Sequence, residues 1–383
     1  MGLGDLPGGS FASRAHAVSG DGSVVVGEGL VSSGPEAFRW TAEGGMEGLG
    51  DLEGGIFHST AAAVSADGSV VAGWSVSGEG REAFRWSETE GLQGLADLPG
   101  GPFESVASDV SADGSVIVGT SDSCFCARLS SRDEAFRWSS ADGMVGLGDA
   151  VPQMKVGSGA SAISGDGSRV AGFSFNFGSG SKHVVLWSEG TDVRVLGDLP
   201  GGRPEGAASA ISSDGSTVVG LGYSDSGFEA FRWTQEDGIV GLGDLQGGGF
   251  SSKALGVSAD GTTVAGSGHT DSGFRAFIWD EAHGMRDLQD VLEGELGLDL
   301  MGWTLSQATG VSDDGRTIVG SGTNAAGDGE AWIAVVPEPA SDVLGGCAIA
   351  TLLLLRPHRA QTSELRPARG RSIEGRSKTW FDA

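Results

Sequence analysis

Residues 61–73 of this chain read Ala-Ala-Ala-Val-Ser-Ala-Asp-Gly-Ser-Val-Val-Ala-Gly. Two short apolar runs flank an Asp-Gly pair, which is typical of a β-hairpin because glycine readily adopts the positive φ that such turns require. The pattern occurs seven times, and its turn aspartates are Asp21, Asp67, Asp113, Asp166, Asp214, Asp260 and Asp314. Their spacing of 46 to 54 residues indicates one supersecondary unit copied along the chain.

Each copy contains two further motifs. Glu-Ala-Phe-Arg-Trp occupies residues 36–40, 82–86, 134–138 and 229–233, with looser copies at 183–187, 275–279 and 330–334. Its alternation puts Phe and Trp on one face and Ala and Arg on the other, as expected of a third strand. Leu-Gly-Asp-Leu is the expected fourth strand, with aspartates Asp5, Asp51, Asp97, Asp149, Asp198, Asp244 and Asp287. Four strands in about 46 residues are the length of a propeller blade.

The ends of the chain indicate how the ring closes. Residues 3–6 read Leu-Gly-Asp-Leu with no blade before them, and the last repeat stops after its third strand at residues 330–335. Hairpins and fourth strands match in number only if the N-terminal strand completes the last blade. We therefore predict an all-β fold, a seven-bladed β-propeller over residues 1–335, with a short C-terminal helical segment.

Composition and charge restrict the function. The formal net charge is −27, which excludes nucleic acid as a partner because phosphates would be repelled. This charge suits a soluble extracellular surface or one that binds cations. The three cysteines, Cys124, Cys126 and Cys347, allow neither a disulfide framework nor a CxxC metal site.

The repeated polar residues are more typical of turns than of a reactive site. Each Asp-Gly turn offers one carboxylate, whereas Ca²⁺ takes about six to eight oxygen ligands. We therefore expect no cofactor, and Ca²⁺ on the ring of turn aspartates is the alternative. The six histidines occupy unrelated positions of the repeat, and no His/Asp/Ser arrangement or unique acidic pair indicates a catalytic site.

The three motifs together resemble those of the HAF-repeat proteins, a family of bacterial proteins regarded as extracellular. Ala-Phe-Arg-Trp, Ser-Ala-Asp-Gly-Ser and Leu-Gly-Asp-Leu carry the resemblance across residues 1–335. The long excursion at residues 287–300, followed by Gly-Trp-Thr-Leu, is also similar to the last repeat of that family. The resemblance implies an extracellular location and supplies no biochemical activity.

The C-terminal region resembles a second pattern, the PEP-CTERM sorting signal. Residues 336–341 read Val-Pro-Glu-Pro-Ala-Ser, and an apolar stretch at 343–355 precedes arginines. The resemblance implies that an exosortase-type membrane protease recognises Pro337, Glu338 and Pro339. The apolar stretch has 13 residues, whereas a membrane span needs about 20, so a buried or interfacial tail helix is the alternative.

These resemblances predict the domain organisation and the location. We expect a sorting and membrane-contact segment at residues 336–360 and a basic, disordered tail at 361–383. We expect a secreted or envelope-associated protein. Residues 1–4, Met-Gly-Leu-Gly, have no signal-peptide character, so we expect the true start to lie upstream; an intracellular protein is the alternative.

Strand direction separates two rims of the predicted ring. The Asp-Gly turns and the turns after Trp lie on one rim, and the loops after the second strand and the links between blades lie on the other. Every irregular length falls on the second rim, at residues 120–133, 150–157, 173–182 and 289–303. Because variable loops on a rigid scaffold often carry binding, the candidate ligand contacts are Phe125, Arg128, Phe175 and Phe177. Tolerated surface insertions are the alternative.

These observations predict a non-enzymatic propeller that binds a glycan or a surface or matrix protein through its irregular rim. The alternative is an extracellular polysaccharide hydrolase or lyase on the same scaffold. Such an enzyme would need converging carboxylates or a His-Tyr pair, and the chain has a single tyrosine, Tyr223.

Overall fold

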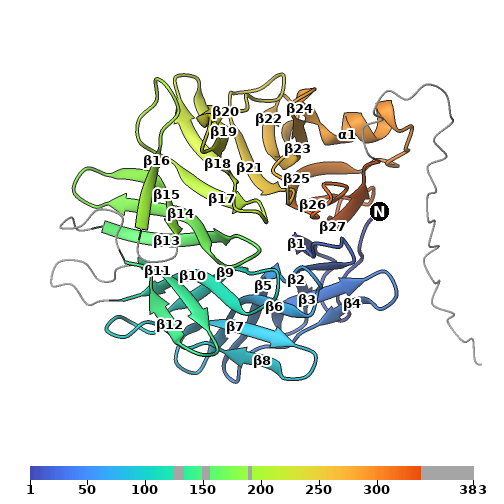
Figure 1. The fold of residues 1–383 in the computed structure, drawn as a ribbon. Coiled ribbons are helices and arrows are strands. Elements are labelled where there is room, and N and C mark those ends of the chain that lie inside the picture. The colour runs from blue at the N-terminus through green and yellow to red at the C-terminus, as the bar shows by residue number, and fades with distance from the viewer. Residues whose placement is uncertain (124–132, 149–155, 189–191, 338–383) are drawn as a thin grey trace, which may run out of the picture. The chain divides into compact units, whose positions relative to one another are not determined.

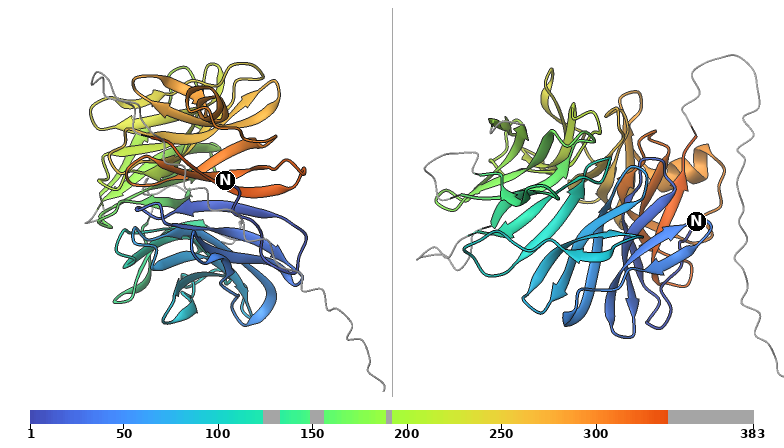
Figure 2. Two further views of the ribbon diagram at one scale, coloured as in Figure 1. Left: turned by 90° about the vertical axis from the view of Figure 1, so that its right-hand side faces the viewer. Right: turned by 60° about the horizontal axis from the view of Figure 1, so that its bottom comes forward.

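The computed structural model describes residues 1–123, 133–148, 156–188 and 192–337. Seven antiparallel sheets stand around a central axis like the blades of a propeller (Figures 1 and 2). Each sheet runs in chain order from an inner first strand to an outer last strand. The predicted seven-bladed β-propeller is therefore confirmed.

The strands of each blade have the following bounds. Blade 1 holds β1 (Ser13–Val18), β2 (Val24–Val31), β3 (Gly34–Thr41) and β4 (Gly45–Gly48), and blade 2 holds β5 (Gly54–Val64), β6 (Val70–Ser77), β7 (Arg81–Ser87) and β8 (Gly91–Gly94). Blade 3 holds β9 (Ser105–Val110), β10 (Val116–Asp122), β11 (Asp133–Ser139) and β12 (Gly143–Gly146), and blade 4 holds β13 (Val156–Ile163), β14 (Arg169–Asn176), β15 (Ser181–Ser188) and β16 (Asp192–Gly197). Blade 5 holds β17 (Ala207–Ile211), β18 (Thr217–Ser224), β19 (Gly227–Thr234) and β20 (Gly238–Gly241), and blade 6 holds β21 (Ser252–Val257), β22 (Val264–Thr270), β23 (Gly273–Asp280) and β24 (Gly284–Asp287). Blade 7 holds β25 (Thr304–Val311), β26 (Thr317–Thr323) and β27 (Gly329–Val335).

The core consists of apolar layers between neighbouring blades. In blade 1, Phe38 and Trp40 pack toward blade 7, and Ala37 packs toward blade 2. This is the alternation expected for the third strand. The glycine six residues after each turn aspartate is a steric requirement: a Cβ on Gly27 would lie 1.9 Å from the carbonyl oxygen of Arg14 on β1.

The N-terminus completes blade 7. The Leu3 amide donates to Ala331 O at 2.9 Å, and the Ile333 amide donates to Met1 O at 3.0 Å. The Gly4 amide donates to Glu330 Oε1 at 3.0 Å. The predicted closure by strand exchange is therefore present, and Leu3 and Leu6 are buried in the layer between blades 7 and 1.

The fourth strand lies slightly earlier than the sequence motif predicted. In blade 1 it covers Gly45–Gly48, and the Leu49 amide makes its last bond, to Ala37 O at 2.8 Å. Gly50 then adopts φ of +79°, and its amide donates to Glu36 Oε1 at 3.0 Å. The Leu-Gly-Asp-Leu motif therefore ends the strand and turns the chain, because its glycine takes a left-handed conformation.

The turn aspartates satisfy the hairpins internally. Asp67 Oδ1 accepts the Ser65 hydroxyl at 2.7 Å and the Ser69 amide at 3.0 Å. Equivalent bonds occur in all seven turns. Hydrogen bonds from Ser164 and Ser168 lower the pKa of Asp166 to about 2, because they stabilise the ionised carboxylate.

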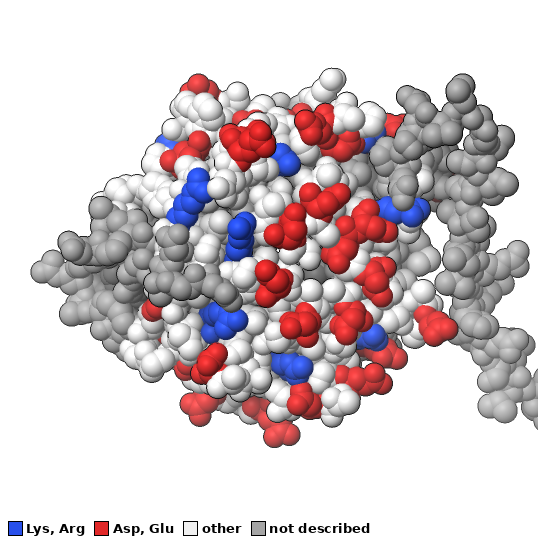
Figure 3. Space-filling model, viewed as in Figure 1, with Lys and Arg blue, Asp and Glu red and all other residues white. Residues whose placement is uncertain are grey.

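Backbone bonds join the seven turns into a closed ring around the axis. The Ala66 amide donates to Ala112 O at 3.0 Å, and the Asp313 amide closes the ring on Gly20 O at 2.9 Å. Figure 3 shows the face on which these turns lie, with acidic side chains gathered around its centre. The repeated carboxylates thus belong to the scaffold of this rim.

The excursion before blade 7 contains the helical turns of the described chain. They are α1 (Leu288–Asp290) and the π-helical turn η1 (Val291–Glu295). Leu288, Val291 and Leu292 are buried beside blade 7. No helix in the described residues is long and apolar enough to cross a membrane. The predicted C-terminal helical segment, with the stretch 343–355, lies outside the described residues.

Candidate ligand-binding rim

We call the surface opposite the Asp-Gly turns the irregular-loop rim. It comprises the loops between the second and third strands of each blade and the links from one blade to the next. The described parts of the irregular segments, including residues 173–182 and 289–303, lie at these connections. Of the candidate contacts, Phe125 and Arg128 lie outside the described residues.

Phe175 and Phe177 come from the end of β14 and the turn that follows it. Their rings pack edge to face, with centroids 5.1 Å apart, and Phe177 remains 40% exposed. The Lys182 ammonium lies 3.9 Å from the centroid of Phe173 on the same strand as Phe175. The structure therefore brings the two predicted phenylalanines together beside a cation held over a third ring.

Sequence reasoning missed most of the exposed apolar side chains of this rim. Among the described residues, eleven large hydrophobic side chains are exposed, and six belong to the irregular-loop rim: Phe11, Ile56, Phe177, Phe250, Phe274 and Met301. None of the eleven lies in an Asp-Gly turn. Phe11 and Phe250 lie in links between blades, each two residues before the serine that begins a first strand, Ser13 and Ser252, so a position shared by two links was a signal available in the sequence.

Cations and aromatic rings also pair along this rim. The Arg81 guanidinium carbon lies 4.8 Å from the Trp74 centroid, and that of Arg203 lies 4.5 Å from the Tyr223 centroid. Such stacks restrict the rotamers of both partners while keeping the charge near solvent. They occur in blade 2 and around blade 5, so the rim presents ring faces and positive charges at several points of its circumference.

Two lysines lie on this rim, and they are the lysines of the described chain: Lys182 and Lys253. Burial lowers the pKa of both ammonium groups, and the positive charge of Lys253 lowers that of Lys182 further. Burial disfavours the charged form of each lysine, and an anionic ligand beside it would favour that form. The rim therefore carries positive charge in an otherwise strongly acidic protein.

A carboxyl pair that sequence reasoning did not identify stands at the base of the longest insertion. Asp122 on β10 and Asp133 on β11 are directly opposed in the strand register. Asp122 is only 5% exposed. Burial, together with Asp133 and the charges of Glu104 and Asp97, raises the pKa of Asp122 to about 6. Like charges directly opposite each other destabilise a strand pair, so stability of the sheet does not explain why blade 3 carries two acids here.

The sequence contained a signal for this pair. Asp122 lies nine residues after its turn aspartate, where the other blades carry Leu30, Val76, Phe175, Tyr223, His269 and Thr323. Alignment of the repeats thus isolates one acid at this position. The sequence analysis found no unique acidic pair, and the strand register of blade 3 brings one together.

The arginines of the third strand pair with acids of the turn that follows. Arg85 pairs with Glu90, and Arg232 Nη1 lies 3.7 Å from Asp237. Both acids lie in the turn before the fourth strand, which the arginine reaches on its own side of the sheet. In the described part of the chain, no group of three or more His, Cys, Asp or Glu side chains could hold a metal ion.

Comparisons with known proteins identify the fold. No protein-family model matches the sequence, and no curated protein matches it. The β-propeller domain of the trilobed protease from Pyrococcus furiosus, described as an open velcro, is 12% identical with a TM-score of 0.53, over 85% of this chain and 94% of that one. An oligogalacturonate lyase from Vibrio parahaemolyticus is 13% identical with a TM-score of 0.52, over 85% and 92%. A prolyl endopeptidase structure is 13% identical with a TM-score of 0.53, and this chain spans 50% of its length. At these identities the likeness shows a β-propeller and nothing finer.

Proposed function

We propose that this propeller is a non-enzymatic scaffold of the cell envelope or exterior that binds a glycan or a surface protein through its irregular-loop rim. The observation that carries the proposal is the concentration of exposed aromatic side chains on this rim, at Phe11, Phe177, Phe250 and Phe274. Exposed rings are unfavourable in water, and they are enriched where partners bind. Ring faces stack on sugar rings as well as on protein side chains.

Export and sorting are part of the proposal. The HAF-like repeats and the Pro337-Glu338-Pro339 motif support an exported protein that exosortase-type machinery processes. Glu338, Pro339 and residues 343–355 lie outside the described residues, so the sequence pattern alone supports this step. Expression with its natural upstream DNA, followed by fractionation and mass spectrometry of the C-terminus, tests it: an intact protein in the cytoplasm would contradict export and sorting.

A glycan array tests the binding function. We expect the wild-type chain to bind a subset of glycans, and the double variant Phe177→Ala/Phe274→Ala to lose that binding. Val240→Ala is the matched control, because Val240 is 48% exposed on the outer strand β20, away from the rim. If no glycan is bound, capture of cell-surface proteins with the same variants tests the second ligand class. Equal binding by the double variant and the control would contradict the rim as the binding surface.

A polysaccharide hydrolase or lyase is the second candidate, and the Asp122–Asp133 pair favours it. A carboxyl with a pKa of about 6 is half protonated near pH 6 and can act there as a general acid. Incubation of the bound glycans with wild type and Asp122→Asn would decide this point. If wild type cleaves a bound glycan and Asp122→Asn does not, the protein is an enzyme and the proposal of a non-enzymatic scaffold is wrong.

A further inference from the structure

Three of the four arginines between Phe and Trp of the third strand have an acid five residues later, at the end of the next turn. Five residues after Arg85, Arg137 and Arg232 come Glu90, Asp142 and Asp237. The Arg85–Glu90 and Arg232–Asp237 pairs form in the structure. Five residues after Arg39, blade 1 carries Gly44 instead. The first blade therefore keeps the arginine but has no acid at this position. Glu47 lies opposite Arg39 in the register of β3 and β4.

Arg39 also lacks a contact that Arg232 makes in blade 5. In blade 5, Arg232 Nε donates to Gly261 O of the next blade's Asp-Gly turn at 3.4 Å. The equivalent acceptor for Arg39 is Gly68 O. Arg39 Nε is instead buried and has no hydrogen-bond partner in the described part of the chain. A buried donor without a partner costs free energy, which a ligand oxygen would recover.

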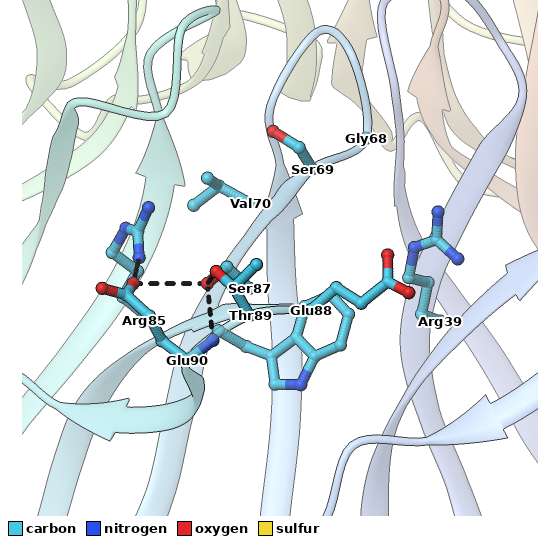
Figure 4. A pocket seen from close by; sticks show the side chains of 10 residues that line it. Arg39, Gly68, Ser69, Val70, Arg85, Ser87, Glu88, Thr89 and Glu90 are labelled. Carbon is cyan, nitrogen blue, oxygen red and sulfur yellow. Dashed lines mark hydrogen bonds and ion pairs between the residues drawn. The ribbon is translucent and has the colours of Figure 1, made fainter.

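A cavity opens where these contacts are missing. It lies between blades 1 and 2 on the rim of the Asp-Gly turns, and its volume is about 480 Å³. Its lining residues are Arg39, residues 68–70 and residues 85–90. In Figure 4, Arg39 and Arg85 stand on opposite sides, Arg85 is joined to Glu90, and the carboxylate of Glu88 points toward Arg39. This volume falls within the range of small-ligand sites.

We propose that this cavity is a binding site for a small carboxylate ligand, an acidic sugar of the hexuronic acid class. The carboxylate would take the place of the missing turn acid, on the planar guanidinium of Arg39, which suits two parallel hydrogen bonds. The Ser69, Ser87 and Thr89 hydroxyls line the same cavity and can bond the sugar hydroxyls. The Trp86 ring adds an apolar wall.

Glu88 sets the charge balance of the site. Arg85 is neutralised by Glu90, so Arg39 and Glu88 are the remaining charges of the cavity lining, with Glu47 opposite Arg39 on β4. A carboxylate ligand must displace Glu88 from the side of Arg39, and removal of its charge in Glu88→Gln strengthens binding. The cavity lies on the rim of the Asp-Gly turns, opposite the irregular-loop rim of the proposed function, so each proposal can be refuted without affecting the other.

Calorimetric titration with sodium glucuronate tests the proposal, with glucose as the uncharged counterpart and inorganic phosphate as a second anion. The decisive variant is Gly44→Glu, which restores the acid present in the other blades. A side chain fits there, because a Cβ on residue 44 would meet only Thr41 Oγ1 at 3.0 Å and the Glu47 carboxylate, with Oε1 at 3.5 Å, both in flexible side chains. Arg232→Gln is the matched control, since Arg232 lies in blade 5.

We expect wild type and Arg232→Gln to bind glucuronate equally, and Gly44→Glu and Arg39→Gln to bind it at least about tenfold more weakly. Glu88→Gln binds it more tightly. The proposal is overturned if wild type binds no glucuronate, if glucose or phosphate binds as tightly, or if a folded Gly44→Glu variant binds as well as wild type. Gly44→Glu keeps the test valid even if Arg39→Gln fails to fold.

Discussion

The closure of the ring by the N-terminal strand makes a quantitative prediction about Leu3 and Leu6. These side chains are 6% and 3% exposed in the layer between blades 7 and 1. Substitution of a buried leucine by alanine costs about 2–5 kcal/mol in free energy of unfolding. The double variant Leu3→Ala/Leu6→Ala should therefore lose several kcal/mol, a large part of the roughly 5–15 kcal/mol that holds a protein folded.

The chain contains a matched control for this variant. Leu95 and Leu98 occupy the same motif positions after blade 2 and are 6% and 5% exposed. Leu95→Ala/Leu98→Ala removes the same atoms from a segment that is covalently attached at both ends. The strand at residues 1–6 instead pairs with β27, which lies more than 320 residues away in sequence, so its loss of packing allows it to leave β27 while the other six blades remain paired.

Hydrogen exchange separates these outcomes. The Ile333 amide donates to Met1 O, so it loses its partner when the strand dissociates. A loss of about 4 kcal/mol corresponds to about 10³-fold faster exchange. We expect this acceleration at Ile333 in the Leu3/Leu6 variant and not in the Leu95/Leu98 control. A protected Ile333 amide, or a melting temperature equal to that of wild type, would refute closure by these residues.

Three further outcomes are expected. Asp67→Ala should lower the free energy of unfolding at pH 7 by about 1–2 kcal/mol, because it removes the acceptor of the turn. The Ser69 bonds lower the pKa of Asp67, so the difference in stability between wild type and Asp67→Ala should vanish as pH falls through that lowered pKa. Denaturation at pH 7 and pH 2 checks this. Asp109 accepts the Val110 and Ile163 amides, and burial raises its pKa to about 7. Wild type should therefore lose stability relative to Asp109→Ala as pH rises from about 4 to about 7. A stability difference between the two proteins that does not change with pH would contradict this prediction. Deletion of residues 124–131 should leave the melting temperature within a few degrees and reduce ligand binding; unchanged binding would remove this loop from the binding surface.

Much of the fold followed from the sequence because the repeat is exact where backbones touch. The alanine and glycine six residues either side of each turn aspartate reflect a contact that admits no larger side chain, as the 1.9 Å approach at Gly27 shows. The fourth strand was placed too late because Leu-Gly-Asp-Leu is the more regular motif, whereas strands such as Gly45–Gly48 vary in sequence and are held mainly by backbone bonds. Side-chain identity carries little information about such a strand.

The candidate sites were less predictable because they depend on contacts between strands and between blades. Asp122 and Asp133 are eleven residues apart in sequence, and only the register of β10 and β11 places them opposite each other. The cavity beside Arg39 depends on a turn acid absent at Gly44 and on the neighbouring turn at Gly68. Neither arrangement can be read from one repeat alone, although a comparison of all seven copies marks the positions.

The repeated polar residues have structural partners that leave them little capacity for a ligand. The turn aspartates bind the Ser hydroxyls and amides of their own hairpins, and the Glu36 carboxylate accepts the Gly50 amide. Ser59 Oγ accepts the Ala37 amide at 2.9 Å and donates to Gly50 O, which joins blade 2 to blade 1. A departure from the pattern in a single blade lacks the partner that the repeat supplies elsewhere. Because buried polar groups require partners, Arg39 is one of the positions in the described residues where a buried donor has no partner in the scaffold, and the proposed ligand would supply that partner.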